Sequence, residues 1–280
     1  MSIHEALDIL VAKSRGAIPI NDGDYINEDD GLLYCGKCNT PKQTKITVLG
    51  KIRKPYCLCK CEEEKFDAEE EEKKRIEFER RVDALRKTGF PDAYMLNWTF
   101  ANDDLENEKL TKAMKRYVEH FPEMRKQGKG LLLHGSMGRG KTYAACEVAN
   151  ALVDKGYSVL VTNFSRLLNT LQGTFEKQEY LDSLNDFSLL VIDDLGIERE
   201  TAYAKEQIYN IVDSRYRAGL PMIITTNLTL DNIKKPDDIA DGRVYDRIIE
   251  RCFPIEVTGS NRRHKVVKES YEDMKELLGL

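Results

Sequence analysis

Residues Gly135-Ser-Met-Gly-Arg-Gly140-Lys141-Thr142 form a complete G-x-x-x-x-G-K-[ST] loop. Its glycines let backbone N–H groups close around a polyphosphate, and the helix that follows offers its positive N-terminal end to the same anion. The preceding residues 130–134 form a short apolar run, and residues 142–155 carry apolar side chains at helical spacing. Strand, glycine loop and helix therefore stand in the order that a nucleotide-binding P-loop requires.

Every residue of this loop, and the tyrosine after it, is a candidate for binding nucleotide. We expect Lys141 to reach the β- and γ-phosphates, and we expect the Thr142 hydroxyl to help hold Mg²⁺. The full set of candidates is Gly135, Ser136, Met137, Gly138, Arg139, Gly140, Lys141, Thr142 and Tyr143.

A P-loop predicts a second, acidic element at the end of another buried strand, and residues 188–196 (SLLVIDDLG) supply it. Their apolar run ends in Asp193 and Asp194, where the carboxyl edge of a parallel sheet would carry a ligand site. We expect Asp193 to bind Mg²⁺ through water and Asp194 to polarise the attacking water. Because Asp reaches less far than Glu, slow hydrolysis is expected, with Glu198 as the alternative to Asp194.

A third strand, residues 221–226, ends in a polar trio formed by Thr225, Thr226 and the following Asn227. In AAA+ ATPases the strand between those of the P-loop and the acidic pair ends in a residue called sensor 1, which contacts the γ-phosphate or its water. Asn227 matches this role, and an ordinary strand followed by an Asn turn is the alternative.

Composition narrows the class of protein. The chain has 280 residues, of which 32% are charged, and a net charge of −5, so any contact with nucleic acid must come from a local basic patch. No stretch approaches eighteen apolar residues, and the first residues lack the pattern of a signal peptide. The sequence therefore predicts a cytoplasmic protein that does not enter a membrane.

From about residue 90 the chain alternates helices and strands, which predicts an α/β fold with a parallel sheet covered by helices on both faces. Strands are expected at 130–134, 157–162, 188–193, 221–226 and 253–258, and helices at 106–121, 141–155, 164–176, 203–218, 241–252 and 270–278. Upstream, residues 62–87 consist almost entirely of Glu, Lys and Arg, which is typical of a solvated connector helix. A partner-binding helix is the alternative.

Five of the seven cysteines lie within residues 35–61. A C-x-x-C turn and a second segment with C-x-C suit a tetrahedral zinc site built from thiolates. Five cysteines compete for four places, and we favour Cys35, Cys38, Cys59 and Cys61, with Cys57 as the alternate. Free thiols or an iron–sulfur centre are the alternatives to zinc.

The segment between the cysteine pairs, residues 43–53, predicts a short hairpin with Gly50 near its turn. A module this small buries little core, so bound metal would supply much of its folding free energy. We therefore expect a small zinc-binding domain at residues 1–61, a charged helical linker at 62–89 and the ATPase domain at 90–280. Cys146 and Cys252 occupy helical periodic positions and are expected to be buried apolar residues.

Arginines near the C-terminal end carry two further predictions. Residues 242–251 place arginines at i, i+4 and i+8 of a helix, which suits either a salt-bridged surface helix or an arginine finger that completes the ATP site of a neighbouring subunit. Residues 259–265 (GSNRRHK) are locally basic and suit a sensor 2 arginine or a nucleic-acid contact.

The motifs GSMGRGKT, LLVIDDLG, RYRAGLPMIITTNL, RVYDRIIERC and TGSNRR together resemble the DnaC-type replicative helicase loaders of bacteria and phages over residues 90–268. The cysteine knuckle, the C-x-C and the charged helix upstream are similar to loaders of the DnaI and phage type. IstB-type transposition helper ATPases share the ATPase core, but the N-terminal zinc module favours a loader.

The resemblance implies an AAA+ ATPase that uses ATP, Mg²⁺ and Zn²⁺ and loads a hexameric DnaB-type helicase onto single-stranded DNA. Family members grip the helicase with the N-terminal module, and their ATPase domains form a spiral around the DNA. The alternatives are a transposition helper and a zinc-dependent adaptor that uses ATP as a binding switch.

The resemblance also assigns the arginines. Arg247 best matches the family's arginine finger, with Arg243 and Arg251 as alternatives. The sensor 2 position falls on Arg262 or Arg263, and we prefer Arg263.

Overall fold

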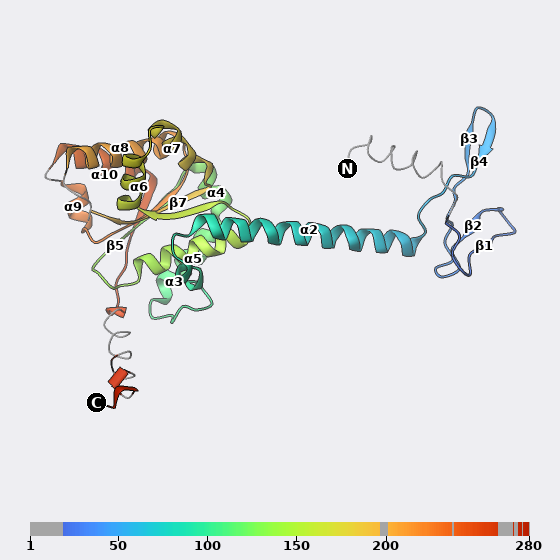
Figure 1. Cartoon of the computed structure of the whole chain (residues 1–280), viewed down its shortest axis with the longest axis horizontal. Coiled ribbons are helices and arrows are strands. Elements are labelled where there is room, and N and C mark those ends of the chain that lie inside the picture. The colour runs from blue at the N-terminus through green and yellow to red at the C-terminus, as the bar shows by residue number, and fades with distance from the viewer. Residues whose placement is uncertain are drawn as a thin grey trace. The chain divides into compact units, whose positions relative to one another are not determined.

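The computed structural model describes residues 19–196, 201–236, 238–262, 271, 274–275 and 277–279. The chain divides into two compact units, Met1–Phe78 and Glu79–Leu280, and the division falls inside the long helix α2 (Lys60–Gly89). Figure 1 labels the elements of both units. The functional division at residues 61 and 89 stays a prediction.

Two small antiparallel hairpins provide the strands of the first unit. The pairs are β1 (Tyr25–Ile26) with β2 (Leu33–Tyr34), and β3 (Ile46–Val48) with β4 (Lys51–Arg53). Leu49 and Gly50 join β3 to β4 with φ angles of 50° and 72°, and two positive φ angles are what a two-residue type I′ turn requires. The hairpin expected between the cysteine pairs is confirmed.

Within the first unit, a buried lysine joins the hairpin segment to the start of α2. The Lys42 side chain is fully buried, and its ammonium lies 2.8 Å from Asp24 and 3.4 Å from Glu62 in the first turn of α2. Burying a charged amine is costly unless opposite charges pair with it. These two carboxylates therefore fix Lys42 and hold the hairpins against the helix.

Helix α2 covers the charged segment predicted to be a connector. Its first turn carries acidic residues and its last turn basic ones, which suits the helix dipole at both ends. Within α2 only Val82 and Gly89 are buried, and Val82 and Leu85 pack into the core of the second unit. The rest of the helix is solvated, as its sequence predicts.

The second unit contains the α/β fold. Its strands are β5 (Gly130–His134), β6 (Val159–Asn163), β7 (Leu189–Leu195), β8 (Met222–Thr226) and β9 (Cys252–Glu256). Its helices are η1 (Ala93–Asn97), α3 (Glu108–Glu119), α4 (Phe121–Gln127), α5 (Lys141–Asp154), α6 (Phe164–Gly173), α7 (Lys177–Ser183), η2 (Leu184–Asp186), α8 (Ala202–Arg217), α9 (Leu230–Lys234) and α10 (Ile239–Arg251).

All five strands of this unit are parallel and stand in the order β6-β7-β8-β5-β9. Strand β8 therefore lies between the strand that leads into the P-loop and the strand that carries the two aspartates, as the sequence predicted. The carboxyl ends of β5, β7 and β8 meet at one edge of the sheet, where ligand sites form in open α/β folds.

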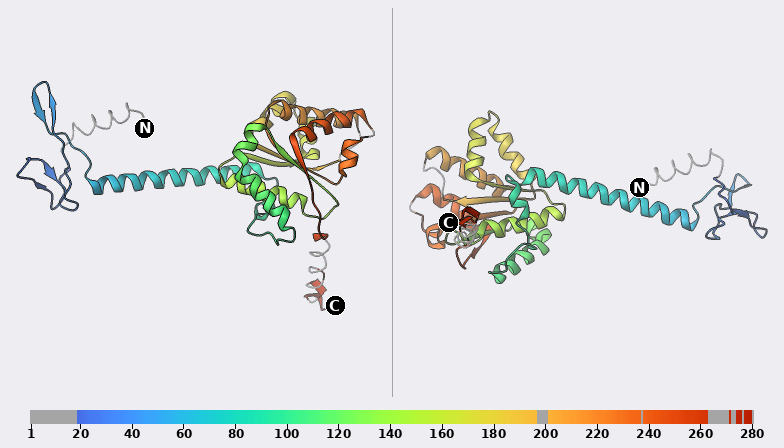
Figure 2. Two further views of the ribbon diagram at one scale, coloured as in Figure 1. Left: turned by 180° about the vertical axis from the view of Figure 1, so that it is seen from behind. Right: turned by 60° about the horizontal axis from the view of Figure 1, so that its bottom comes forward.

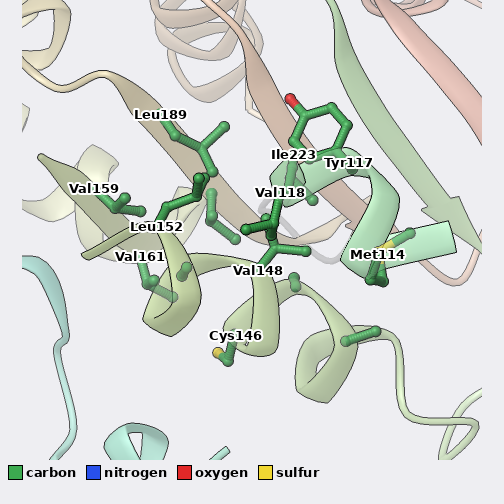
Figure 3. Packing of buried hydrophobic residues seen from close by; sticks show 14 of the residues in the cluster. Met114, Tyr117, Val118, Cys146, Val148, Leu152, Val159, Val161, Leu189 and Ile223 are labelled. Atoms are coloured by element: carbon green, nitrogen blue, oxygen red, sulfur yellow. The ribbon is translucent and has the colours of Figure 1, made fainter. Parts of the chain in front are cut away.

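Helices cover both faces of the sheet (Figures 1 and 2). Alternate residues of β7 point to opposite faces: Leu189 joins the core under α3 and α5, and Leu190 joins the core under α6, α8 and α10. Figure 3 shows the first core, in which Leu152 of α5 lies near Leu189 and Val148 lies near Val118 of α3. Cys146 and Cys252 are buried in these two cores, as predicted. The expected helical position of Cys252 is wrong, because α10 ends at Arg251 and Cys252 begins β9.

The chain contains short helices that the sequence did not predict. The expected helix at 106–121 ends at Glu119, and α4 starts anew at Phe121 because Pro122 fits the first turn of a helix. Helix α6 ends at Gly173 and α7 follows after a short break. Within the expected helix at 270–278, the described residues 271, 274–275 and 277–278 are helical, and the other positions lie outside the described residues.

Among the described residues, no helix combines the length and the apolar character that crossing a bilayer requires.

Candidate functional site

The glycine loop joins the end of β5 to the start of α5. Gly135, Gly138 and Gly140 have φ angles of 138°, 77° and 90°, which side chains rarely tolerate. Gly140 is the N-cap of α5 and no side chain caps that helix. The backbone N–H groups of the first turn of α5 are therefore available to an anion held in the loop.

Lys141 is buried beneath the loop with 5% of its surface exposed. Its ammonium donates to the carbonyl oxygens of Gly135 and Ser136 at 2.8 and 2.9 Å. It also donates to the Asn227 side-chain oxygen at 2.7 Å. The two residues expected to meet the γ-phosphate therefore lie side by side, Lys141 at the start of α5 and Asn227 directly after β8.

Asp193 sits at the centre of a hydrogen-bonded cluster. Its Oδ1 accepts hydrogen bonds from the hydroxyls of Thr142 at 2.8 Å and Thr225 at 2.5 Å. Burial raises the pKa of Asp193, and the two threonine hydrogen bonds oppose that shift. A carboxylate and a hydroxyl next to the phosphate loop form the hard oxygen donor set that Mg²⁺ prefers, so these residues fit that ion.

Asp194 adopts a left-handed backbone conformation with a φ angle of 58°. The pairing of β7 with β8 shifts register at this point, between Ile192 and Leu195. The Asp194 N–H donates to the Thr225 hydroxyl at 3.0 Å. The strand pairing is therefore locally disrupted at the second of the two aspartates.

Thr225 is a site residue that sequence reasoning missed. It is fully buried, and its hydroxyl bridges the Asp193 carboxylate and the Asp194 backbone. A polar residue at the end of an otherwise apolar buried strand is the signal that would have found it.

Of the two arginines proposed for sensor 2, the structure describes one. The Arg262 N–H donates to the Gly138 carbonyl oxygen at 2.9 Å, and a methyl group added to Gly140 would lie 3.3 Å from Arg262 Nη1. The Arg262 side chain therefore lies against the glycine loop. Arg263, the preferred candidate, and Glu198, the alternative catalytic carboxylate, lie outside the described residues.

Arg247 is held by side chains of its own subunit. Its Nε lies 2.6 Å from Asp213 Oδ1 and its Nη2 donates to the Tyr209 hydroxyl at 2.7 Å. The guanidinium also lies 4.6 Å from the centre of the Tyr209 ring. Arg243 is exposed one turn earlier, and Arg251 donates to backbone oxygens of Gln127 and Tyr216 at 3.4 Å.

Four cysteines of the first unit converge. The Sγ atoms of Cys35, Cys38, Cys59 and Cys61 all lie within 4.8 Å of one another. Two of the separations are 3.4 and 3.6 Å, close to the roughly 3.8 Å between thiolates that share one zinc with Zn–S bonds of about 2.3 Å. The Cys57 thiol instead faces the Pro41 carbonyl oxygen at 3.6 Å. The cluster therefore has the number and type of donors that fit Zn²⁺.

Hydrogen bonding prepares one of these thiols for metal. The Thr40 hydroxyl lies 3.0 Å from Cys38 Sγ, and this contact is the largest of the effects that lower the pKa of Cys38 to about 6. Since the thiolate is the form that binds metal, Thr40 favours the ligand form of Cys38.

Comparison with known proteins gives consistent relatives. Residues 70–270 match the family model of IstB-like ATP binding proteins. The replicative helicase loader DnaI of Bacillus subtilis is 26% identical over 264 residues, which are 86% of this chain and 81% of DnaI. The replicative helicase loader DnaC of Buchnera aphidicola subsp. Schizaphis graminum is 31% identical over 173 residues, 59% of this chain and 68% of DnaC.

Two solved structures share the fold. The crystal structure of DnaI superposes with a TM-score of 0.52 at 28% identity, covering 62% of this chain and 95% of that one. The crystal structure of the DnaC helicase loader superposes with a TM-score of 0.50 at 25% identity, covering 60% of this chain and 100% of that one. DnaI and DnaC are both named as replicative helicase loaders. Their solved structures share the fold that carries the P-loop and the aspartate pair in this chain.

Proposed function

The chain belongs to the family of IstB-like ATP binding proteins, and we propose that it is an ATPase that loads a replicative hexameric helicase onto single-stranded DNA. One observation carries this proposal. The P-loop residues Lys141 and Thr142 contact Asn227 and Asp193, as expected of an ATP site, and the same chain contains a four-cysteine cluster. Similarity to the helicase loader DnaI covers 86% of the chain, more than residues 70–270 alone make up.

The ATP site assigns a role to each residue at the sheet edge. Residues 135–143 bind the nucleotide, with Lys141 neutralising the β- and γ-phosphates. Asp194 polarises the attacking water and Asn227 senses the γ-phosphate. Hydrolysis is slow and depends on DNA and on assembly, because Asp194 has a shorter reach than Glu and the site lacks its trans arginine until subunits meet.

Two metals have separate duties in this scheme. Thr142 and Asp193 hold Mg²⁺, which supplies charge neutralisation at the phosphates when bound. Zinc on the cysteine cluster supplies folding free energy for a module with little core of its own. The two sites lie in different units of the chain, so loss of one metal leaves the other site intact.

The N-terminal zinc module, residues 1–61, grips the helicase, and residues 62–89 link it to the ATPase domain at 90–280. Support comes from the solvated character of α2, in which the buried residues lie at its C-terminal end. A solvated helix of 30 residues suits a spacer between a partner-binding module and an enzyme.

Contact with single-stranded DNA requires a local surface, because the chain as a whole is acidic. Phe175, between α6 and α7, is fully exposed, and Lys177, two positions later, begins α7. An aromatic ring beside a lysine gives bases a surface to stack on and phosphates a positive charge. We assign this loop to the DNA that the assembled spiral encloses.

Assembly completes the ATP site through an arginine of the neighbouring subunit. Arg247 is our candidate, and a guanidinium is the group that stabilises charge developing on the γ-phosphate. In the single chain it is held by Asp213 and Tyr209, which fix its position on the surface of α8 and α10.

The family model's name favours a second candidate function, that of a transposition helper ATPase. It shares the ATP site and the assembly, and it differs in its partner. The cysteine cluster and the similarity to DnaI outside the ATPase region favour the loader.

Co-purification separates the two functions. The full chain, mixed with ATP and a DnaB-type hexamer, should co-elute with the helicase, and a fragment of residues 1–87 should suffice for binding. Binding to a transposase and not to the helicase would support the second function. Helicase binding without any ATP turnover, with or without single-stranded DNA, would support a zinc-dependent adaptor that uses ATP only as a switch.

A further inference from the structure

Two segments that are far apart in sequence run alongside each other next to the P-loop. One comprises Asp103–Asn107, before α3, and the other comprises Thr258–Arg262, after β9. Three contacts join them at every second residue of the later segment. The Asn107 side-chain amide donates to the Thr258 carbonyl oxygen at 2.9 Å. The Ser260 backbone N–H donates to Glu106 Oε1 at 3.1 Å. Arg262 Nη2 lies 2.8 Å from Asp104 Oδ1.

Charged and buried groups stabilise the contact between these two segments. The Ser260 hydroxyl also donates to Glu106, and these two hydrogen bonds are the chief reason that the pKa of Glu106 lies below its ordinary value. The Asp103 side chain is 2% exposed, and Arg262 Nη2 lies 3.6 Å from it. Moving Arg262 away would leave that buried carboxylate without this cation, which is costly.

The far side of the later segment faces the phosphate loop. Arg262 N–H donates to Gly138 O at 2.9 Å. A methyl group added to Gly138 would lie 2.1 Å from the Asn261 side-chain oxygen, and one added to Gly140 would lie 3.3 Å from Arg262 Nη1. Residues 258–262 therefore contact residues 103–107 on one side and the P-loop on the other.

We propose that Glu106 is a positioning residue for nucleotide binding, which fixes residues 258–262 across the P-loop and so holds the Arg262 guanidinium where it meets the phosphates of ATP. Asp104 and Asn107 assist it at the two ends of the segment. Glu106 itself bonds to Ser260, its Oε2 lies 3.8 Å from Arg262 Nε, and it acts through Arg262. An arginine held in place before ATP arrives loses less conformational entropy on binding.

The proposal rests on the proposed function in one respect, since it requires that the P-loop binds ATP. It adds a residue in a region without a phosphate-binding motif, 29 positions before the loop begins. The prediction concerns the phosphates, because Arg262 lies against Gly138 and Gly140 of the loop.

Equilibrium titration of the full chain with a non-hydrolysable ATP analogue, and separately with AMP, tests this assignment. Glu106→Gln should weaken binding of the ATP analogue roughly 3- to 10-fold, the effect of one ordinary hydrogen bond, and leave AMP binding unchanged. Ser260→Ala should act in the same direction. Glu108→Gln is the matched control, because Glu108 pairs only with the exposed Lys112 among the described residues.

The double variant gives the decisive comparison. If Glu106 acts through Arg262, Glu106→Gln should weaken ATP binding no further in an Arg262→Ala chain. Additive losses would overturn the proposal, as would equal losses for AMP and the ATP analogue, which indicate a general structural role. Tighter ATP binding by Glu106→Gln would also overturn it, because the carboxylate would then compete with the phosphates for Arg262.

The outcomes separate this inference from the proposed function. Failure of the unaltered chain to bind the ATP analogue would reject both. Normal binding by the unaltered chain together with an unchanged affinity in Glu106→Gln and Ser260→Ala would reject the positioning role alone. Matching circular dichroism spectra and melting temperatures for all variants would show that each is folded.

Discussion

The Lys141 ammonium donates a hydrogen bond to the Asn227 side-chain oxygen at 2.7 Å, and so connects the P-loop to the end of the adjacent strand β8. Because Asn227 and the loop carbonyls hold the ammonium from three sides, its position is set before a phosphate arrives. Preorganised charge of this kind is what a phosphate site requires. The same contact places Asn227, the proposed γ-phosphate sensor, beside Lys141, which we propose binds that phosphate.

Asp194→Asn should bind ATP normally and hydrolyse it more slowly. The amide cannot polarise water as a carboxylate does, and the expected loss is about 10²-fold or more in turnover. Asn tolerates the left-handed conformation of this residue, with its φ angle of 58°, so the backbone should be preserved. Single-turnover assays with equilibrium ATP binding as the control measure the effect, and turnover equal to that of the unaltered chain would move the role to another carboxylate, first to Glu198.

Replacing Cys35 and Cys38 together by Ser should abolish zinc binding and unfold the first unit. ATP affinity should change little, because the P-loop lies in the other unit. Cys57→Ser is the matched control and should retain one zinc per chain, since the Cys57 thiol lies outside the cluster. Elemental analysis of protein purified without chelators measures the metal, and an absence of zinc from the unaltered chain would contradict the assignment.

Arg247→Ala should bind ATP nearly as well as the unaltered chain and lose ATP-dependent assembly or DNA-stimulated turnover. The reason is that its proposed target is the γ-phosphate of the neighbouring subunit. Mixing Arg247→Ala with Lys141→Ala should restore part of the activity, because some interfaces then join an intact arginine to an intact loop. Mixed oligomers without activity would contradict a role in trans, and full activity of Arg247→Ala alone would transfer the role to Arg243 or Arg251.

The buried Glu147 carboxyl should make the folding stability of the chain depend on pH. It is 2% exposed and Oε1 has no hydrogen-bond partner among the described residues, and burial raises its pKa to about 8. The folded chain therefore holds a proton that the unfolded chain releases near pH 4.3, so this group lowers stability as pH rises between those values. Melting temperatures should show Glu147→Gln gaining a few degrees over the unaltered chain between pH 5 and 9; a constant difference would contradict the assigned burial.

The sequence predicted those parts of the fold in which the residue types restrict the backbone conformation and also supply functional groups. The glycines before Lys141 require positive φ angles, and apolar runs that end in Asp193 or Asn227 identify buried strands by their polar ends. These signals are local, so the strands and the main helices follow from them, whereas the position of β8 between β5 and β7 was implied by the resemblance to AAA+ ATPases. The short helices α4, α7 and α9 were not predicted, because so few residues carry no usable periodicity.

Contacts between distant segments were beyond the reach of the sequence. No local pattern pairs Glu106 with Ser260, which lie 154 positions apart, because the pairing depends on where β9 ends relative to α3. Helical spacing alone also gave no sign that Asp213 and Tyr209 hold Arg247. Spacing left five cysteines for four places, and the folded chain separates them because the Cys57 thiol turns toward Pro41.

Delivery of a DnaB-type helicase to closed circular single-stranded DNA tests the central claim most directly. With this chain and ATP, the amount of helicase bound to the circle should rise at least severalfold over helicase alone. Lys141→Ala, which removes the ammonium that we propose neutralises the phosphates, should give no rise, and Lys112→Ala on the exposed face of α3 should match the unaltered chain. A chain that binds ATP but leaves the helicase on the circle at the level of helicase alone would contradict the claim.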